Sequence, residues 1–310
     1  MKISLLIVIT ISVLCSSCNF LALVDRKQEK KFERNDIHLY KFQDENGVHA
    51  VHYTNNGKPK LMMLHGYGAS GIGQYYRTSL MMREDYDLIL PDLLYCGKST
   101  GDSVDYSIDA QVAHIKTILD SLKIDESVAV IGNSYGGIVA AYFAERYPSL
   151  VNKLVIYDSP VNFYAMTYAD SLAKSLRVES VRNLVSPVSI YETHVALDII
   201  FYDQPYVPRF LRRQMVKYGS MPVRDNQLKL LEYLIEKEKL YNEHIFKWKM
   251  PVYIAWGDHD VLIPMSTCNS IASFYKISPE RVHIFKNAAH AANVEYPKEF
   301  VKYVKRVMSE

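Results

Sequence analysis

Short apolar runs alternate with segments of helical periodicity along most of this chain. The runs that predict buried strands are 60–64, 86–90, 127–132, 153–157, 252–256 and 282–285. Apolar residues recur at helical spacing over 73–83, 107–123 and 135–147. Residues 38–53 form two strand-like runs around Asp44-Glu45-Asn46-Gly47, which predicts a hairpin. Strands that alternate with helices predict an α/β fold with a mostly parallel central sheet and helices on both faces.

The alternation breaks over 161–245, where helix-like stretches and scattered prolines replace the strand runs. This segment predicts a helical cap inserted after the strand at 153–157. Open α/β sheets bind ligands at the carboxyl ends of their strands, so a cap in this position would shape a substrate pocket. The alternative is a structural insertion with no part in selectivity.

The first residues have a different pattern from the rest. Lys2 precedes an uncharged stretch from Ile3 to Val24, which is interrupted by small residues before Cys18. A basic start, an apolar stretch and a small-residue cut site are typical of an export signal. Ser16-Ser17-Cys18 resembles a bacterial lipobox, which makes 1–18 a leader and Cys18 the lipidated residue. The stretch is also long enough for an uncleaved membrane-spanning helix.

Either leader implies an exported, membrane-anchored protein, in the periplasm or at the cell surface. Residues 19–36 include a dense run of charges, which we interpret as a solvated tether. Cys96 and Cys268 remain in the body of the protein, where an exported compartment permits a disulfide, although two buried thiols are the simpler expectation.

Composition limits the possible functions. The chain has 310 residues, 49% of them hydrophobic, which is enough for one elaborated domain with a large core. Its formal net charge of +2 gives no indication of a nucleic-acid partner. The histidines and cysteines show no metal-ligand spacing, so we expect neither a metal nor an organic cofactor.

The segment Gly132-Asn133-Ser134-Tyr135-Gly136 carries the strongest chemical signal. It joins the strand run 127–132 to the helical segment 135–147, and its glycines permit a sharp turn. A serine on such a turn exposes its hydroxyl at the carboxyl end of the strand, beside the positive end of the helix dipole. Ser134 is therefore the candidate nucleophile.

Taken together, several motifs resemble the α/β-hydrolase superfamily, in particular its single-domain members with a helical cap. The resemblance covers about 37–307 and divides the chain into a core, 37–160 with 246–310, and the cap at 161–245. It rests on these motifs, each after an expected strand: His65-Gly66-Tyr67-Gly68, Asp92 with Gly97-Lys98-Ser99, Gly132-Asn133-Ser134-Tyr135-Gly136-Gly137, Trp256-Gly257-Asp258-His259-Asp260, and His290.

The resemblance implies a catalytic triad of Ser134, His290 and Asp260. Serine needs a base, and histidine suits this role because its ordinary pKa lies near neutrality. The acid orients the imidazole, and Asp258 is the alternative for this place. The backbone N–H groups of Tyr67 and Tyr135 are the expected oxyanion donors. His65 would be structural and His259 solvated.

We expect hydrolysis of a carboxylic ester through an acyl-enzyme, as in a carboxylesterase or lipase, with a small-molecule acyl substrate. The alternatives on the same fold are a carbon–carbon bond hydrolase, a peptidase or, less plausibly, a non-catalytic binding protein. Three arginines of the cap, Arg209, Arg212 and Arg213, could meet a substrate carboxylate, or they could form a solvated helix face.

Overall fold

The computed structural model describes residues 19–101 and 105–310 and contains an eight-stranded sheet. The strands are β1 (His38–Asp44), β2 (Gly47–Tyr53), β3 (Lys60–Leu64), β4 (Asp87–Pro91), β5 (Val128–Asn133), β6 (Val151–Tyr157), β7 (Val252–Gly257) and β8 (Val282–Phe285). Their spatial order is β1-β2-β4-β3-β5-β6-β7-β8. The β1–β2 and β2–β4 pairs are antiparallel and all others are parallel. The predicted sheet is confirmed.

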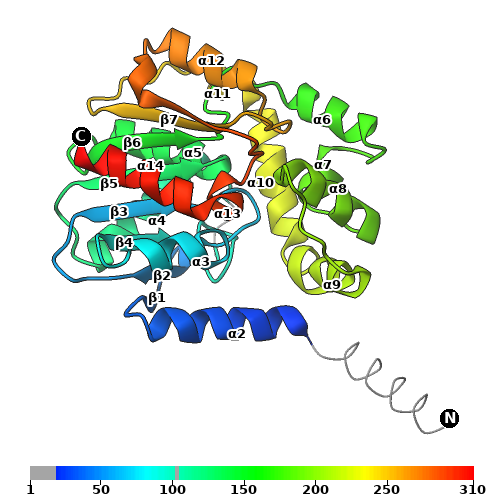
Figure 1. Cartoon of the computed structure of the whole chain (residues 1–310), viewed down its shortest axis with the longest axis horizontal. Helices are drawn as coiled ribbons and strands as arrows, with labels where there is room; N and C mark the ends of the chain where they lie inside the picture. The colour runs from blue at the N-terminus through cyan, green and yellow to red at the C-terminus, as the bar shows by residue number, and fades with distance from the viewer. Residues whose placement is uncertain (1–18, 102–104) are drawn as a thin grey trace, which may run out of the picture.

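Helices cover both faces of this sheet (Figure 1). They are α3 (Gly71–Met82), α4 (Ile108–Ser121), α5 (Tyr135–Arg146), α12 (Met265–Phe274), α13 (Ala292–Glu295) and α14 (Pro297–Ser309), with a short 3₁₀ turn, η2 (Pro279–Arg281). Alternate side chains of β3 enter opposite cores: Leu61 and Met63 pack with α3 and α14, whereas Met62 and Leu64 pack with α4 and α5. The continuous apolar runs are explained by this burial on two faces.

The regular elements of the insertion at 161–245 are all helices, as expected, and the insertion lies to one side of the sheet in Figure 1. Its elements are α6 (Met166–Ser175), α7 (Val181–Val185), α8 (Ile190–Ile200), α9 (Arg209–Gln214), the π-helical η1 (Met215–Ser220), α10 (Arg224–Glu236) and α11 (Glu238–Glu243). A small core of its own, which includes Leu184, Val195 and Ile199, holds α6, α7 and α8 together.

The prediction of a solvated tether over 19–36 is wrong. Residues Phe20–Glu33 form helix α2, which begins at Asn19, whose side chain accepts a hydrogen bond from the Ala22 N–H. Phe32 is fully buried and stacks against the Tyr76 ring. The charged residues that suggested solvation are also good helix formers, and the single aromatic among them supplies the packing.

Glu29 holds the same helix to the sheet. Its carboxylate lies 2.9 Å from His52 Nε2 and also accepts a hydrogen bond from Lys98. Partial burial opposes ionisation of Glu29, but the bonds from His52 and Lys98 outweigh it and lower the pKa of this carboxyl to about 2. Helix α2 is therefore a docked part of the domain and not a linker.

The leader 1–18, with the candidate lipidation residue Cys18, lies outside the described residues. None of the helices within 19–101 and 105–310 combines the length and the apolar character that crossing a bilayer requires. Cys96 and Cys268 are both free and buried, so the expectation of two thiols is confirmed. Burial raises the pKa of each thiol to about 12.

Two buried histidines connect the β1–β2 hairpin to α4. His49 Nδ1 lies 2.7 Å from His114 Nδ1, and His114 Nε2 lies 2.8 Å from the Asp92 carbonyl oxygen. A carbonyl only accepts, so His114 carries its proton on Nε2 and accepts from His49 at Nδ1. Burial lowers the pKa of His114 to about 3, which keeps this ring neutral.

We expect His114 to lower the free energy of unfolding as the pH falls below neutrality. In the unfolded chain the His114 imidazole binds a proton below about pH 6.5. In the folded protein the same ring stays neutral down to about pH 3. Between these values one such group lowers the free energy of unfolding by about 1.4 kcal/mol for each pH unit of acidification. Urea unfolding of His114→Gln from pH 7 to 4 should therefore show a shallower pH slope than the wild type. The exposed His38 supplies the control, since His38→Gln should retain the wild-type slope.

Candidate active site

Ser134 occupies a strained turn between β5 and α5. Its φ of 53° and ψ of −122° lie in a region that non-glycine residues rarely adopt and that costs about 1–3 kcal/mol. Two backbone contacts hold it there: the Ser134 N–H donates to the Tyr157 carbonyl at 2.9 Å, and its own carbonyl accepts from the Ser159 hydroxyl at 2.6 Å. Strain at this turn places the serine side chain at the carboxyl edge of the sheet, as the glycine pattern predicts.

Gly136 makes this turn possible because α5 passes very close to β3. A β-carbon added at Gly136 would lie 2.4 Å from the His65 carbonyl oxygen and 2.6 Å from that of Leu64. Both neighbours are backbone atoms of a central strand end and cannot move aside independently.

We therefore expect Gly136→Ala to lower the free energy of unfolding by about 1–3 kcal/mol, the range typical of overpacked cores. Gly219 in η1 is a matched control, because an added β-carbon there meets no atom within 4 Å. Gly219→Ala should leave stability unchanged or slightly higher. Chemical denaturation of both variants measures the difference, and equal stabilities would contradict the close-approach explanation.

His290 and Asp260 form a buried pair. His290 Nδ1 lies 2.6 Å from Asp260 Oδ2, and the two residues are 7% and 4% exposed. The other oxygen, Asp260 Oδ1, accepts the N–H groups of Leu262 and Ile263, both at 2.9 Å. These two bonds fix the carboxylate, which in turn orients the imidazole so that Nε2 remains as its basic nitrogen.

Asp258, the alternative acid, binds residues other than His290. Its carboxylate lies 2.7 Å from His259 Nδ1 and 3.5 Å from Lys286 Nζ, both of which are exposed. Burial is the largest single effect and opposes ionisation of Asp258, but the hydrogen bonds and charge of these neighbours together outweigh it and lower the pKa of this carboxyl. The structure therefore joins the base to Asp260, as preferred, and places Asp258 in a surface cluster.

A further buried carboxyl, that of Asp158, lies near the carboxylate of the His290–Asp260 pair. Its Oδ1 accepts the Gly257 N–H at 2.8 Å, which joins the ends of β6 and β7. Burial, followed by the charge of Asp260, raises the pKa of Asp158 well above its usual range. A neutral Asp158 supports the acid loop without adding a second negative charge beside it.

Tyr67 and Tyr135 meet beside Ser134, with their rings in an edge-to-face contact at 6.3 Å between centroids. Within the described part of the chain, neither backbone N–H has an acceptor. The Tyr67 hydroxyl donates to the Gln227 carbonyl of α10, which fixes the turn after β3 against the cap. Two unpaired N–H groups on loops held in this way are suited to bind an oxyanion.

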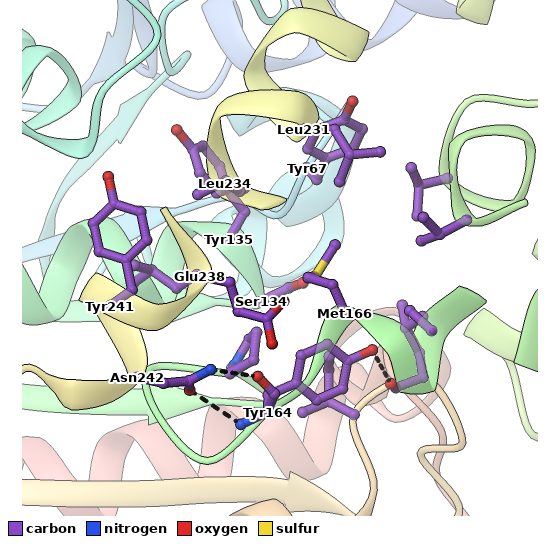
Figure 2. A pocket seen from close by; sticks show the side chains of 17 residues that line it. Tyr67, Ser134, Tyr135, Tyr164, Met166, Leu231, Leu234, Glu238, Tyr241 and Asn242 are labelled. Carbon is purple, nitrogen blue, oxygen red and sulfur yellow. Dashed lines mark hydrogen bonds between the residues drawn. The ribbon is translucent and has the colours of Figure 1, made fainter. Parts of the chain in front are cut away.

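Ser134 lines a pocket between the core and the cap, which is drawn in Figure 2. The pocket holds about 750 Å³, including the part open to solvent, which is within the range of small-molecule sites. Most of its lining is aliphatic or aromatic, with Met166 from α6 and Leu231 and Leu234 from α10. Glu238 is the one charged residue among the lining side chains. Arg209, Arg212 and Arg213 do not line this pocket.

A family model described as alpha/beta hydrolase fold matches residues 59–297. The chain belongs to this family. It is 28% identical over 295 residues to Lipase 1 of Psychrobacter immobilis, covering 89% of this chain and 86% of the relative. It is also 27% identical over 267 residues to a 2-hydroxy-6-oxononadienedioate/2-hydroxy-6-oxononatrienedioate hydrolase of Paraburkholderia phymatum, covering 81% of this chain and 88% of that protein. The crystal structure of a membrane phospholipase A, described as a bacterial virulence factor, shares the fold with a TM-score of 0.78 at 21% identity, over 99% and 96% of the two chains.

The motif histidine and aspartate of this α/β hydrolase are structural. His65 Nε2 accepts the Leu93 N–H at 2.9 Å, so the ring donates from Nδ1 to the Gly66 carbonyl. Asp92 accepts the N–H groups of Gly71 and Lys98 with its two oxygens. Both residues shape the loops after β3 and β4, as the resemblance implies for His65.

Sequence reasoning missed Gln74, which connects three loops of the site. Its side chain accepts the Gly66 N–H and donates to Asn133 Oδ1, both at 2.8 Å, while its carbonyl accepts from Asn293 Nδ2 at 2.9 Å. The oxyanion turn, the nucleophile turn and the His290 loop thus share one residue. Gln74 lies on a helix without a recognisable motif, so no local signal marked it.

Proposed function

We propose that this protein is a serine hydrolase that cleaves carboxylic esters with an uncharged, apolar acyl chain. The observation that carries the proposal is Ser134, which lines an apolar pocket at a strained strand-to-helix turn. The buried His290–Asp260 pair and the two unpaired N–H groups of Tyr67 and Tyr135 supply the other parts of an acyl-transfer site.

In the proposed reaction, Ser134 Oγ attacks the ester carbonyl and its proton passes to His290 Nε2. Asp260 stabilises the resulting imidazolium through Nδ1. The carbonyl oxygen becomes an oxyanion, which the N–H groups of Tyr67 and Tyr135 bind. His290 then protonates the leaving alcohol, and a water molecule releases the acid from the acyl-enzyme by the same route in reverse.

The charge of the pocket favours a neutral acyl chain over a dicarboxylate. No lysine or arginine lines the pocket, and the Glu238 carboxylate would repel a second negative charge in a site of low polarity. The Paraburkholderia relative is named for a dioate, whereas the Psychrobacter relative is named a lipase. The lining side chains of this protein support the second kind of substrate.

The test compares two 4-nitrophenyl esters of equal chain length, the hexanoate and the adipate monoester, whose free carboxylate extends into the pocket. We expect kcat/KM to favour the hexanoate by about 100-fold, which corresponds to one desolvated like-charge contact of about 3 kcal/mol. Glu238→Gln should lower the ratio of kcat/KM for the hexanoate to kcat/KM for the adipate monoester. Glu243→Gln, on the same helix but outside the pocket lining, should preserve it. A preference for the adipate monoester would exclude the proposed specificity.

We also propose that the protein is exported and attached to a membrane as a lipoprotein through Cys18. The basic, apolar and small-residue order of 1–18 supports this. Replacing Cys18 by serine should release the protein from membranes washed at high salt, which screens charged surface contacts, and globomycin should cause the uncleaved precursor to accumulate. Membrane retention of Cys18→Ser would favour the uncleaved spanning helix instead.

A further inference from the structure

Helix α2 bridges the core and the cap. At its C-terminal end, Phe32 is buried in the core and Glu29 is bound by His52 and Lys98. At its start, the Phe20 N–H donates to Gln214 Oε1 of α9 at 2.7 Å, and α2 contacts both α9 and η1. Figure 1 shows α2 and α9 side by side at the end of the molecule where the chain enters. The beginning of the described chain therefore lies against the cap.

Large apolar side chains are exposed at this end of the molecule. Phe20 and Leu23 on the first turns of α2 are 44% and 45% exposed. Tyr206, just before α9, is 91% exposed, and Phe210 on α9 is 52% exposed. Single exposed apolar residues are ordinary, but aromatic and aliphatic side chains gathered on two adjacent helices are typical of a binding surface.

Cations accompany these apolar residues. Arg209, Arg213 and Lys217 are exposed and follow one another at four-residue spacing along α9 and η1, so they share a face. On α2, the exposed Lys27 and Lys30 continue the face that starts at Phe20 and Leu23. None of these five cations takes part in an ion pair within the described residues. Of the acidic groups of α2, Glu29 is already bound to Lys98, whereas Asp25 and Glu33 are exposed.

We propose that this α2–α9 surface, formed by α2, α9 and η1, docks on the negatively charged face of a phospholipid bilayer. Aromatic rings insert favourably at the headgroup level, and unpaired arginine and lysine side chains are attracted to anionic lipids. The site of chain entry agrees with this orientation, because a leader inserted in the bilayer would bring the start of α2 to it. The inference concerns the folded domain and depends neither on ester hydrolysis nor on lipidation of Cys18.

The test places a tryptophan on the surface and measures its quenching by brominated lipid. The full chain carrying Phe210→Trp is reconstituted in vesicles of phosphatidylglycerol and dibrominated phosphatidylcholine. Phe274→Trp is the matched control, since Phe274 is 49% exposed on α12, which Figure 1 shows on the far side of the molecule from α2 and α9. Trp248 and Trp256 contribute the same background to both variants. We expect the added tryptophan at position 210 to be quenched at least twofold more than that at position 274.

Charge reversal distinguishes two causes of quenching at position 210. One is attraction of the cations to anionic lipid, and the other is closeness to the bilayer that the membrane anchor alone would produce. Adding Arg209→Glu, Arg213→Glu and Lys217→Glu to Phe210→Trp should reduce quenching to the level of the Phe274→Trp control. Vesicles that contain dibrominated phosphatidylcholine but no phosphatidylglycerol should lower the quenching at position 210 in the same way. An unchanged thermal unfolding midpoint would show that the charge-reversed variant is folded. Equal quenching at positions 210 and 274, or quenching at 210 that survives charge reversal, would overturn the proposal.

Discussion

Replacing Ser134 by alanine is expected to lower kcat for 4-nitrophenyl hexanoate by about 10⁴–10⁶-fold, the loss seen when a triad nucleophile is removed. Ser134 is the residue that we expect to form the covalent bond with the substrate, whereas the oxyanion donors and the pocket remain in the variant. The residual rate should therefore stay above that of the uncatalysed reaction, with little change in KM.

A fluorophosphonate probe gives an independent measurement, because it reacts only with an activated serine. The wild type should be labelled and Ser134→Ala should not. Ser171→Ala, on the exposed side of α6, should be labelled like the wild type. A folded wild type that does not react with the probe would contradict the enzyme proposal and favour the alternative of a non-catalytic binding protein.

Asp260→Asn is expected to reduce kcat by about 10³–10⁴-fold, because an amide cannot stabilise the imidazolium and favours the wrong tautomer of His290. The amide oxygen can still accept the N–H groups of Leu262 and Ile263, so the loop should keep its shape. Thermal unfolding should confirm that the loss is catalytic and not structural.

Asp258→Asn is the matched control, since Asp258 lies two residues away but binds His259 and Lys286 at the surface. We expect this variant to retain the wild-type kcat and its pH profile. The assignment of the acid would be reversed if Asp258→Asn lost activity and Asp260→Asn did not.

Much of the fold could be predicted from local pattern alone. Continuous apolar runs predict strands that are buried on both faces, and every such run became a strand of the sheet within two residues of its expected bounds. The Ser134 turn was also predictable, because only glycine on its flanks allows a helix to pass so near β3. The order of Ser134, Asp260 and His290 after successive strands then placed all three at one edge of the sheet.

Other features required the tertiary structure, because they depend on contacts between residues far apart in the chain. Nothing local in the charge run of α2 reveals that Glu29 meets Lys98 or that Phe32 is buried against Tyr76. Gln74 acquires its position only when Gly66, Asn133 and Asn293 converge on it.

The choice between Asp258 and Asp260 shows the same division. Both follow β7 and both could carry a charge, so the sequence by itself determined a carboxylate in this loop, a serine on a strained turn and a histidine after the last strand. Only the packed structure decided which carboxylate turns inward, because the N–H groups of Leu262 and Ile263 bind Asp260 while His259 and Lys286 hold Asp258 at the surface. Local sequence determines which groups can react, whereas the strand register and loop hydrogen bonds determine which of them meet.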